Sequence, residues 1–563
     1  MVARVRRAAS RVGLWSLAAL IGAALLVAAG CGGGKKSSSS SPAPAATTTE
    51  AATGGTYTVE LNTDVDYTDP ALDYLSTGWE IQYAVGCKLL NYPDRNGAAS
   101  SQLQPEVASG FPKISNGGKT YTFTVRKGYR FNTGGPVTAQ SFADAINRDA
   151  SPRLQSPAQA FLADIVGAND VLDGKSKTIS GVVADGDKLT ITLVAPAPDL
   201  LARLAMPFFQ AINPALAADR NPNGVNEPAS CGPYYIADRI PNNSITIRRN
   251  PYYRGLRPHN LNEIDYKIGN TPVVIEQNVQ SGTTDYAASG IPPAAYKPVS
   301  DKYGVNKERF WVEPKLSVQY LAMNTSRPLF KNNVKLRQAV NWAISRGALL
   351  VQSGYFGGVL TDQILPPGMP GFKRVSAYPL QQTKQDVAKA KALAKGHTRG
   401  GKAILWTSTT EPAPLQAQVY QQNLKAIGLD VQVQEFARAV QIQKEGIKGA
   451  EFDFTTEGWS ADYADPEDFV NVLLDGRGIR AANNNNVAYF DDPVYNKRMA
   501  EASLLTGDQR YSTYATLDAD ITTNAAPWAA RANSTNRVFV SKNSGCFTYN
   551  AVFGVDLAAL CLK

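Results

Sequence analysis

A short segment near residue 460 holds the side chains best suited to binding chemistry. Residues 458–466 read Gly-Trp-Ser-Ala-Asp-Tyr-Ala-Asp-Pro, so a Trp, a Tyr and two carboxylates stand together with neither helical nor strand periodicity. Asp462 and Asp465 resemble the paired carboxylates of a glycosidase. Asp465 stands in Asp-Pro-Glu-Asp, an ordinary helix start, which favours capping for this residue. Asp462 is therefore the candidate binding carboxylate, with a solvated Asp462 and a merely packed Trp459 as the alternative.

The sequence contains few of the patterns that catalytic or metal sites use. Its two histidines, His259 and His397, lie in a predicted surface turn and at a predicted helix end. Neither a Gly-x-Ser-x-Gly elbow nor a His-Glu-x-x-His motif occurs. No Cys/His spacing indicates zinc. We therefore expect no enzyme, cofactor or metal site, and a secreted hydrolase is only a distant alternative.

The elements around the candidate segment follow from hydrophobic periodicity. From Ala403 to Trp459 the pattern alternates between strands and helices, which implies right-handed crossovers and a parallel sheet. Ligands bind beyond the carboxyl ends of such strands, here residues 406–410 and 458–466, so Trp406 is a further candidate. The predicted order is strand 403–407, helix 415–427, strand 430–436, helix 439–448 and strand 452–457.

Strands and turns dominate the first half of the chain. Residues 119–126 and 188–194 alternate apolar and polar side chains, as half-buried strands do. Beyond about residue 272 helical patterns become frequent, and apolar residues at helical spacing predict one helix over 334–350.

The first 53 residues have the composition of a signal and a tether. Four arginines precede an apolar run over 12–29 that is too short for a confident membrane span, as in a signal peptide over 1–30. Ala29-Gly30 before Cys31 resembles a bacterial lipobox, which implies lipidation of Cys31; a plain secretory signal is the alternative. Residues 31–53 are too poor in large apolar side chains to fold. As a flexible coil they extend about 25 Å.

Charge and cysteine content limit the partners. The formal net charge of +9 falls to +5 without the four arginines of residues 1–30, and no long basic run remains. A mildly basic solvated surface accounts for this better than nucleic-acid binding. With Cys31 lipidated, four cysteines remain for two disulfides outside the cytoplasm. Proximity favours Cys546–Cys561, which leaves Cys87–Cys231, although the other pairings stay open.

Several segments, in order along nearly the whole mature chain, carry a family resemblance. The sequence resembles the extracytoplasmic solute-binding proteins of peptide-type ABC importers, family 5, a class with oligopeptide, dipeptide and nickel receptors. The matching segments are 69–73 (DPALD), 89–93 (LLNYP), 118–128 (GKTYTFTVRKG), 136–139 (PVTA), 231–235 (CGPYY), 249–253 (RNPYY), 324–330 (NTSRPLF), 336–339 (LRQA) and 458–463 (GWSADY).

The resemblance implies an α/β fold of the periplasmic-binding-protein type, class II, with two lobes, two hinge crossings and a ligand cleft between the lobes. On this chain it implies a larger lobe over 54–271 plus 528–563 and a second lobe over 272–527. The crossings are then expected near Thr271-Pro272 and Pro527-Trp528, with closure by hinge rotation.

The resemblance also implies a ligand site. In peptide-binding members a Trp-x-x-Asp loop supplies the carboxylate that pairs with the ligand's amino terminus, and Asp462 is the matching residue. The peptide of those members lies as an added strand beside a segment whose counterpart here is Thr77-Gly78-Trp79. The bulk of Trp79 departs from the family pattern and would limit ligand size. The candidate ligand-binding residues are Asp462, Trp459, Ser460, Ala461, Tyr463, Thr77, Gly78 and Trp79, together with Trp406, which the strand ends indicate.

The resulting expectation is a monomeric, lipid-anchored receptor at the outer face of the cytoplasmic membrane. It would capture a small peptide and deliver it to the transmembrane subunits of an ABC permease, without nucleic acid as a partner. An oligosaccharide or another small solute is the main alternative ligand, because Trp79, Trp406 and Trp459 could stack on sugar rings.

Overall fold

The computed structural model describes residues 53–380 and 385–563. The expected signal peptide, Cys31 and the tether up to residue 52 lie outside the described residues. Within these two ranges, no helix has both the length and the apolar character needed to cross a membrane.

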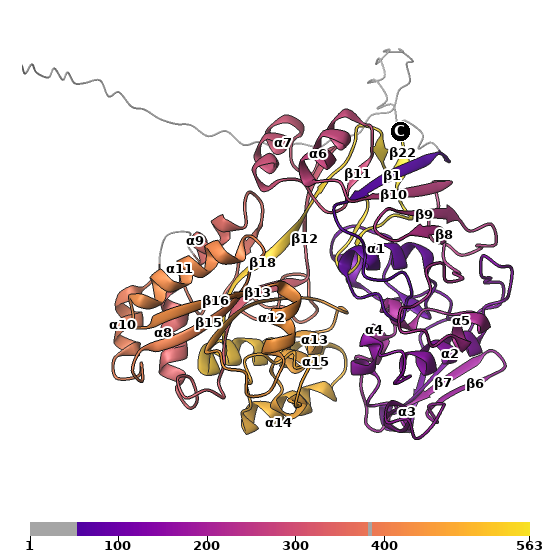
Figure 1. Ribbon diagram of the computed structural model, residues 1–563. Helices are drawn as coiled ribbons and strands as arrows, with labels where there is room; N and C mark the ends of the chain where they lie inside the picture. Colours follow the sequence, from indigo (N-terminus) through magenta and orange to yellow (C-terminus); the bar gives the residue numbers. More distant parts are fainter. Residues whose placement is uncertain (1–52, 381–384) are drawn as a thin grey trace, which may run out of the picture. The chain divides into compact units, whose positions relative to one another are not determined.

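The first lobe, as we use the term, consists of a five-stranded and a four-stranded sheet with their helices (Figure 1). In the larger sheet the order is β11-β1-β10-β9-β8, and β1 runs parallel to both of its neighbours. The strands are β1 (Thr56–Leu61), β8 (Tyr234–Ile240), β9 (Ser244–Arg249), β10 (Glu263–Ile268) and β11 (Tyr286–Ala287); the antiparallel smaller sheet has β4 (Lys113–Ser115), β5 (Thr120–Thr124), β7 (Lys188–Thr192) and β6 (Val182–Asp185).

Helices and short strand pairs complete the first lobe. They are α1 (Ser76–Val85), α2 (Ala139–Asp149), α3 (Ala168–Leu172), α4 (Leu200–Arg203), α5 (Pro214–Ala218), α6 (Pro272–Ser281) and α7 (Tyr296–Tyr303), with the pairs β2 (Leu90–Asn91) and β3 (Gln104–Pro105), β19 (Ser544–Gly545) and β22 (Cys561–Leu562), and β20 (Tyr549–Asn550) and β21 (Gly554–Val555).

The second lobe is built on a seven-stranded sheet, with β14 beside β18 and the other strands in the order β12-β18-β13-β17-β15-β16. Its strands are β12 (Phe310–Pro314), β13 (Ser317–Met323), β14 (Gly358–Leu360), β15 (Lys402–Ser408), β16 (Asp430–Phe436), β17 (Phe454–Ser460) and β18 (Trp528–Phe539); its helices are α8 (Val334–Ala343), α9 (Arg346–Gln352), α10 (Val387–Ala394), α11 (Ala413–Lys425), α12 (Arg438–Glu445), α13 (Glu467–Leu474), α14 (Pro493–Ser503) and α15 (Gly507–Asp520).

The parallel unit predicted between residues 403 and 459 is confirmed. β15 runs parallel to β16 over its full length and parallel to β17 over two residue pairs. α11 and α12 connect these strands, within two to three residues of the predicted helix bounds. The alternation of apolar residues was sufficient here because both the strand period and the Gly428 helix stop are local signals.

The single helix expected over 334–350 is instead two helices. Ile344 has extended backbone angles, φ −74° and ψ 135°, which ends α8. Ser345 then caps α9 through its hydroxyl and donates its N–H to Asn423 Oδ1 at 2.7 Å. A contact from α11, distant in sequence, therefore stabilises a break that the periodicity conceals.

Sheet membership changes twice along the chain. β11 still pairs with β1 of the first lobe, and the next strand, β12, belongs to the second lobe. The long β18, yellow in Figure 1, pairs with β12, β13 and β14, and Val540 directly after it bridges to Tyr286. Judged by strand pairing, the chain passes from the first lobe to the second between β11 and β12, and it returns to the first lobe directly after β18. The lobe boundaries expected at 271/272 and 527/528 stay a proposal.

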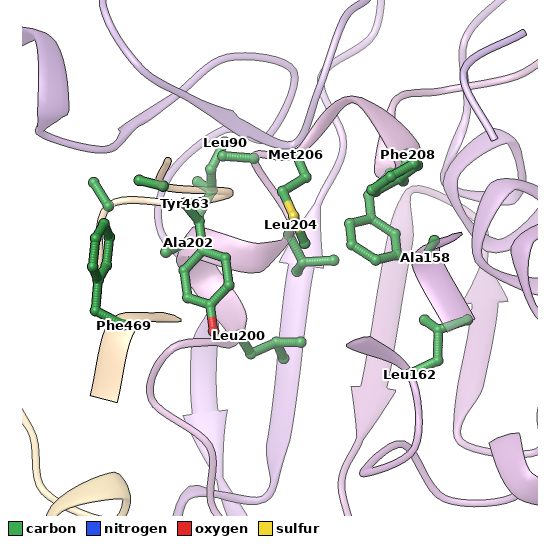
Figure 2. Packing of buried hydrophobic residues seen from close by; sticks show 14 of the residues in the cluster. Leu90, Ala158, Leu162, Leu200, Ala202, Leu204, Met206, Phe208, Tyr463 and Phe469 are labelled. Carbon is green, nitrogen blue, oxygen red and sulfur yellow. The ribbon is translucent and has the colours of Figure 1, made fainter. Parts of the chain in front are cut away.

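Apolar packing continues from one lobe to the other. The largest buried cluster contains Leu200 and Ala202 of the first lobe together with Tyr463 and Phe469 of the second. Figure 2 shows the Tyr463 ring beside Ala202, with its hydroxyl directed toward Leu200. The Tyr463 hydroxyl donates to Asp199 Oδ2 at 3.3 Å. Residues following β17 therefore join the two lobes.

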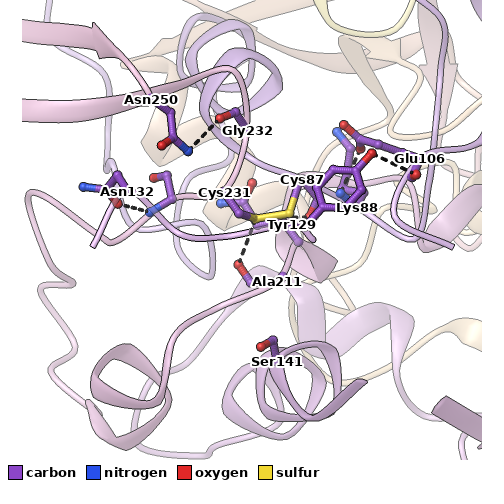
Figure 3. The surroundings of a disulfide bond; sticks show 12 residues. Cys87, Lys88, Glu106, Tyr129, Asn132, Ser141, Ala211, Cys231, Gly232 and Asn250 are labelled. Carbon is purple, nitrogen blue, oxygen red and sulfur yellow. Dashed lines mark hydrogen bonds between the residues drawn. A yellow bond between two sulfur atoms is a disulfide. The ribbon is translucent and has the colours of Figure 1, made fainter. Parts of the chain in front are cut away.

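The described residues form two disulfides, with the pairing that sequence proximity favours. Cys87–Cys231 closes 144 residues of the first lobe, and Cys546–Cys561 closes a loop of 15 near the C-terminus. Figure 3 shows the first bridge beside Tyr129 and Lys88, with Cys231 Sγ close to the Ala211 carbonyl. This bridge joins the end of α1 to the segment before β8.

Candidate ligand-binding site

A cavity of about 230 Å³ lies where the two lobes meet. The first lobe contributes residues in and before α1 and residues 549–554, whereas the second lobe contributes residues 315–316 before β13, residues 459–462 at and after the end of β17, and Asn536 of β18. Of the residues predicted from the sequence, Trp459, Ser460, Ala461, Asp462 and Trp79 line this cavity. The fold therefore brings together segments almost 400 residues apart.

Asp462 is a buried carboxylate without a counter-charge. Its side chain is 8 % exposed, and Oδ2 accepts a hydrogen bond from the Tyr74 hydroxyl at 2.8 Å. Among the described residues, no Lys, Arg or His nitrogen lies within 4.0 Å of it. Burial raises the pKa of Asp462 to about 7, and the Tyr74 hydrogen bond acts in the opposite direction. A bound cation would supply the missing charge.

Asp468 holds the loop that carries Asp462. Its Oδ2 accepts the Trp459 indole N–H at 3.2 Å and the Asp462 backbone N–H at 3.1 Å. Burial raises the pKa of Asp468 well above its ordinary value, and the charge of Asp462 adds to this effect. Asp468 lies in α13, so the helix start after Pro466 positions the binding loop.

Asp465 has the structural role that its sequence context favours. Its Oδ1 accepts the Glu467 N–H at 2.9 Å, at the start of α13. The same carboxylate is paired with Arg510 at 2.7 Å, and Glu467 lies 2.6 Å from the same guanidinium. Asp465 does not line the 230 Å³ cavity.

The segment Thr77-Gly78-Trp79 forms the first turn of α1. Its helical backbone does not offer the alternating donors and acceptors of a strand edge, so a ligand strand would have to pair elsewhere. Gly78 is required by packing, because a Cβ there would lie 2.1 Å from the Asp73 carboxylate. Trp79 lines the cavity, donates its indole N–H to the Asp73 carbonyl at 2.9 Å and packs against Phe208.

Trp406 and Tyr463 lie outside this cavity. The Trp406 indole donates to Gln434 Oε1 at 2.9 Å and packs edge-on against Phe436, so it belongs to the core of the second lobe. Tyr463 lies between the lobes, where its hydroxyl donates to Asp199 Oδ2. The strand end indicates Trp406 and the family resemblance indicates Tyr463, and neither signal reveals which way the ring points.

Residues that the sequence analysis missed complete the cavity. Tyr74 precedes α1, Glu80 lies within it, and Lys315 lies between β12 and β13. Burial raises the pKa of Glu80 to about 8, although its Oε1 accepts the Val555 N–H at 3.1 Å. Burial lowers the pKa of Lys315, and the nearby Glu80 opposes this shift. The position of Tyr74 just before the Thr77–Trp79 segment could have indicated it as a site residue. No sequence pattern around Lys315 indicates that this residue lines a cavity.

A second cavity, of about 550 Å³, adjoins the first, and Ser460 lines both. Ser408 and Thr410 at the end of β15, and Glu457 and Gly458 of β17, line it. This is the edge where parallel strands are expected to hold ligands. Because Ser460 lines both cavities, the candidate site extends along the end of β17.

Residues 102–480 match the family model described as "Bacterial extracellular solute-binding proteins, family 5 Middle". The chain belongs to this family. As a family 5 solute-binding protein, it is 25 % identical over 425 residues to the Periplasmic oligopeptide-binding protein OppA of Salmonella typhimurium, a match that covers 72 % of this chain and 75 % of the relative. It is also 25 % identical over 419 residues to the Probable deoxycholate-binding periplasmic protein YgiS of Escherichia coli, covering 72 % and 75 %.

The fold of this solute-binding protein is shared with solved structures. One is the "Clavulanic acid biosynthesis oligopeptide binding protein 2", with a TM-score of 0.84 and 23 % sequence identity over 91 % of this chain and 96 % of that chain. The two-lobed α/β fold of the periplasmic-binding-protein type, expected from the sequence, is confirmed. Family 5 solute-binding proteins bind substrates, and that is the established class of this chain.

Proposed function

We propose that this solute-binding protein captures short peptides and that Asp462 pairs with their free amino terminus. The observation that carries the proposal is the buried Asp462 carboxylate, which lines an interlobe cavity and has no Lys, Arg or His nitrogen of the described residues within 4.0 Å. A peptide ammonium would supply that cation and would replace the Tyr74 hydroxyl. An ion pair shielded from water is stronger than one at the surface.

The backbone of β17 supports an extended ligand. β15 pairs with β17 only at Phe454 and Thr455, so the edge of β17 beyond Thr455 has no strand partner on that side among the described residues. Residues 456–460 along this edge line the two cavities. A peptide added to this edge would be held by main-chain hydrogen bonds, which tolerate any side chain.

The names of relatives also favour a peptide, because oligopeptide-binding proteins are among both the curated and the solved relatives. The name of the probable deoxycholate-binding relative indicates that members of the family also bind other solutes. A ligand without an amine would leave Asp462 buried and unpaired, whereas a peptide uses it.

The remainder of the proposal concerns delivery. After cleavage before Cys31, a lipid on this residue and the tether over 31–53 would hold a monomeric receptor at the outer face of the cytoplasmic membrane. There it would pass its ligand to the transmembrane subunits of an ABC permease. Globomycin sensitivity of processing and radiolabelled palmitate incorporation, both lost in Cys31→Ser, test the anchor.

Calorimetric titration with di- to pentapeptides, their N-acetylated forms and oligosaccharides tests the ligand. We expect free peptides to bind and N-acetylated peptides to bind at least about a hundredfold more weakly, since removal of one partner of a buried pair commonly costs about 3–5 kcal/mol. Asp462→Asn should cause a similar loss. Binding of sugars but not peptides, or equal binding of acetylated and free peptides, would refute the proposal.

A further inference from the structure

Residues 462–464, which we call the interlobe loop, follow β17 and contact the first lobe at three successive positions. Each position forms one hydrogen bond in which a tyrosine hydroxyl takes part: Tyr74 donates to Asp462 Oδ2 at 2.8 Å, Tyr463 donates to Asp199 Oδ2 at 3.3 Å, and the Tyr92 hydroxyl accepts the Ala464 N–H at 2.9 Å. Of the three loop residues, only Asp462 lines the 230 Å³ cavity. Ligand binding therefore does not account for the other two contacts.

The contacts of Tyr463 and Ala464 are buried. Tyr463 and Tyr92 are at most 2 % exposed, and Ala464 is buried as well. The Tyr463 ring lies edge-on to Phe161 of the first lobe, with 6.3 Å between the ring centroids, and Figure 2 shows it beside Ala202. Separation of the lobes would expose this ring and exchange each hydrogen bond for one to water, so each bond contributes modestly to closure.

The interlobe loop is fixed on the second lobe. Asp468 Oδ2 accepts the Asp462 N–H at 3.1 Å, and the Ala461 N–H, just before the loop, donates to the Leu316 carbonyl at 2.8 Å. Asp468 lies in α13 and Leu316 directly precedes β13. The loop therefore moves with the second lobe, and its three contacts break together when the lobes rotate apart.

The partners in the first lobe are fixed in the same way. Asp199 Oδ2 is also paired with Arg203 Nε at 2.9 Å, and the Tyr92 carbonyl accepts the Tyr83 hydroxyl at 2.9 Å. Asp199 therefore has a cationic partner of its own. Loss of the Tyr463 hydroxyl would leave no unpaired charge in the first lobe.

Cavities on either side of the loop limit the contact between the lobes. One, of about 360 Å³, is lined by Tyr463, by Asp199 of the first lobe and by Glu467 of the second. Another, of about 450 Å³, lies between Tyr121 of the first lobe and Asp465 of the second. The lobes thus meet at the interlobe loop and stand apart next to it, so a few contacts decide between the closed and the open form.

All three hydrogen bonds join groups of the chain itself, so they form without a solute. We propose that the interlobe loop is a lock that keeps the lobes of the empty receptor closed, with the Tyr74 hydroxyl bound to Asp462. A solute can enter only the open form, so the lock lowers the apparent affinity in proportion to the open fraction. This inference concerns the empty chain and does not depend on which solute the receptor binds.

Pulsed electron paramagnetic resonance on the ligand-free full chain measures closure. Spin labels on Lys175→Cys, just after α3, and Lys497→Cys, in α14, report the separation of the lobes. Both lysine side chains are exposed, and Figure 1 shows α3 and α14 at the lower ends of the two lobes. A Cys31→Ser background leaves these two thiols as the only free ones, because the other four cysteines form disulfides.

We expect the otherwise unchanged labelled chain to give one distance, the one that the structure sets for these two sites. Tyr74→Phe, Tyr92→Phe and Tyr463→Phe should each raise the ratio of open to closed molecules about fivefold. The triple variant should raise it about a hundredfold, so that a second, longer distance appears. The control Tyr489→Phe removes a buried hydroxyl that bonds to the Glu445 carbonyl at 2.7 Å within the second lobe, and it should keep the single short distance.

Three results would overturn the lock: a long distance in the otherwise unchanged labelled chain, a triple variant that keeps the short distance alone, or the same opening in Tyr489→Phe as in the lock variants. Should the triple variant not fold, the double variant Tyr74→Phe, Tyr463→Phe decides. Its ratio of open to closed molecules should rise about 25-fold, and an unchanged distance would contradict the proposal. No ligand enters these measurements, so their outcome is independent of the peptide titrations that test the proposed function.

Discussion

The Tyr74 hydroxyl donates a hydrogen bond of 2.8 Å to Asp462 Oδ2, and this bond joins the segment before α1 to the loop after β17. Tyr74 is 39 % exposed, whereas Asp462 is buried, so the contact closes the carboxylate off from one side. A hydroxyl donor occupies the place where an ammonium would bind. In our proposal the ammonium of the ligand therefore replaces the Tyr74 hydroxyl as the donor and gives Asp462 a positively charged partner.

Peptide affinity should fall below about pH 7. Burial raises the pKa of Asp462 to about 7, and an ammonium pairs only with the ionised carboxylate. Each pH unit below this value should weaken binding by up to about tenfold, and affinity should level off above it until the amino group of the peptide deprotonates near pH 8. Calorimetry between pH 5 and 8 measures this, and Asp462→Asn should remove the slope.

Tyr74→Phe supplies the control for this pH dependence. The Tyr74 hydroxyl lowers the pKa of Asp462, and its removal should shift the midpoint of the affinity curve to higher pH. The stability of the empty protein should change with pH in the opposite direction. The Asp462 carboxyl keeps its proton up to about pH 7 in the folded state, whereas in the unfolded chain it releases the proton near pH 4. The contribution of Asp462 to the free energy of unfolding should therefore fall as the pH rises from about 4 to 7. An unchanged midpoint in Tyr74→Phe would contradict the coupling.

Asp465 and Asp462 should respond in opposite ways to the same substitution. Asp465→Asn breaks a buried pair with Arg510 and should lower the free energy of unfolding by about 3–5 kcal/mol, with peptide affinity changed little. Asp462→Asn should leave stability near that of wild type and abolish tight binding. Urea unfolding and calorimetry on both variants measure the contrast. Loss of affinity in Asp465→Asn at full stability would place that residue in the site instead.

Removal of the disulfide that closes the longer loop should lower the stability of the protein more. In the chain-entropy description, the bridge over 144 residues contributes about 5 kcal/mol and the bridge over 15 residues about 3 kcal/mol. We expect the double variant Cys87→Ser, Cys231→Ser to unfold at lower urea concentration than Cys546→Ser, Cys561→Ser. Neither pair lines the two cavities, so peptide affinity should persist in both. The reverse order of stability would contradict the expectation.

Local patterns predicted much of the second lobe. The strands at 402–408 and 430–436 and the helix between them follow from short-range periodicity and from the glycine stop at Gly428, which act within a few residues. The break at Ile344-Ser345 was missed, because its cause lies in Asn423, on another helix. Periodicity indicates which face of an element is apolar. It does not report a contact such as the one between Ser345 and Asn423, which are 78 residues apart.

Some residues of the candidate site could likewise be predicted from the sequence, and others could not. The segment 458–463 combines unusual residue types in one loop, so the sequence by itself identified Asp462 as the candidate binding carboxylate and Asp465 as a helix-starting residue. It also determined the family, the α/β class and the favoured cysteine pairing, all of which depend on residue type and order along the chain. Tertiary structure alone decided that Thr77–Trp79 is helical, that Trp406 is in the core, and that Tyr74 and Lys315 line the cavity with Asp462. The physical reason is that burial without a counter-charge, the property that marks Asp462, depends on groups brought together from distant parts of the chain.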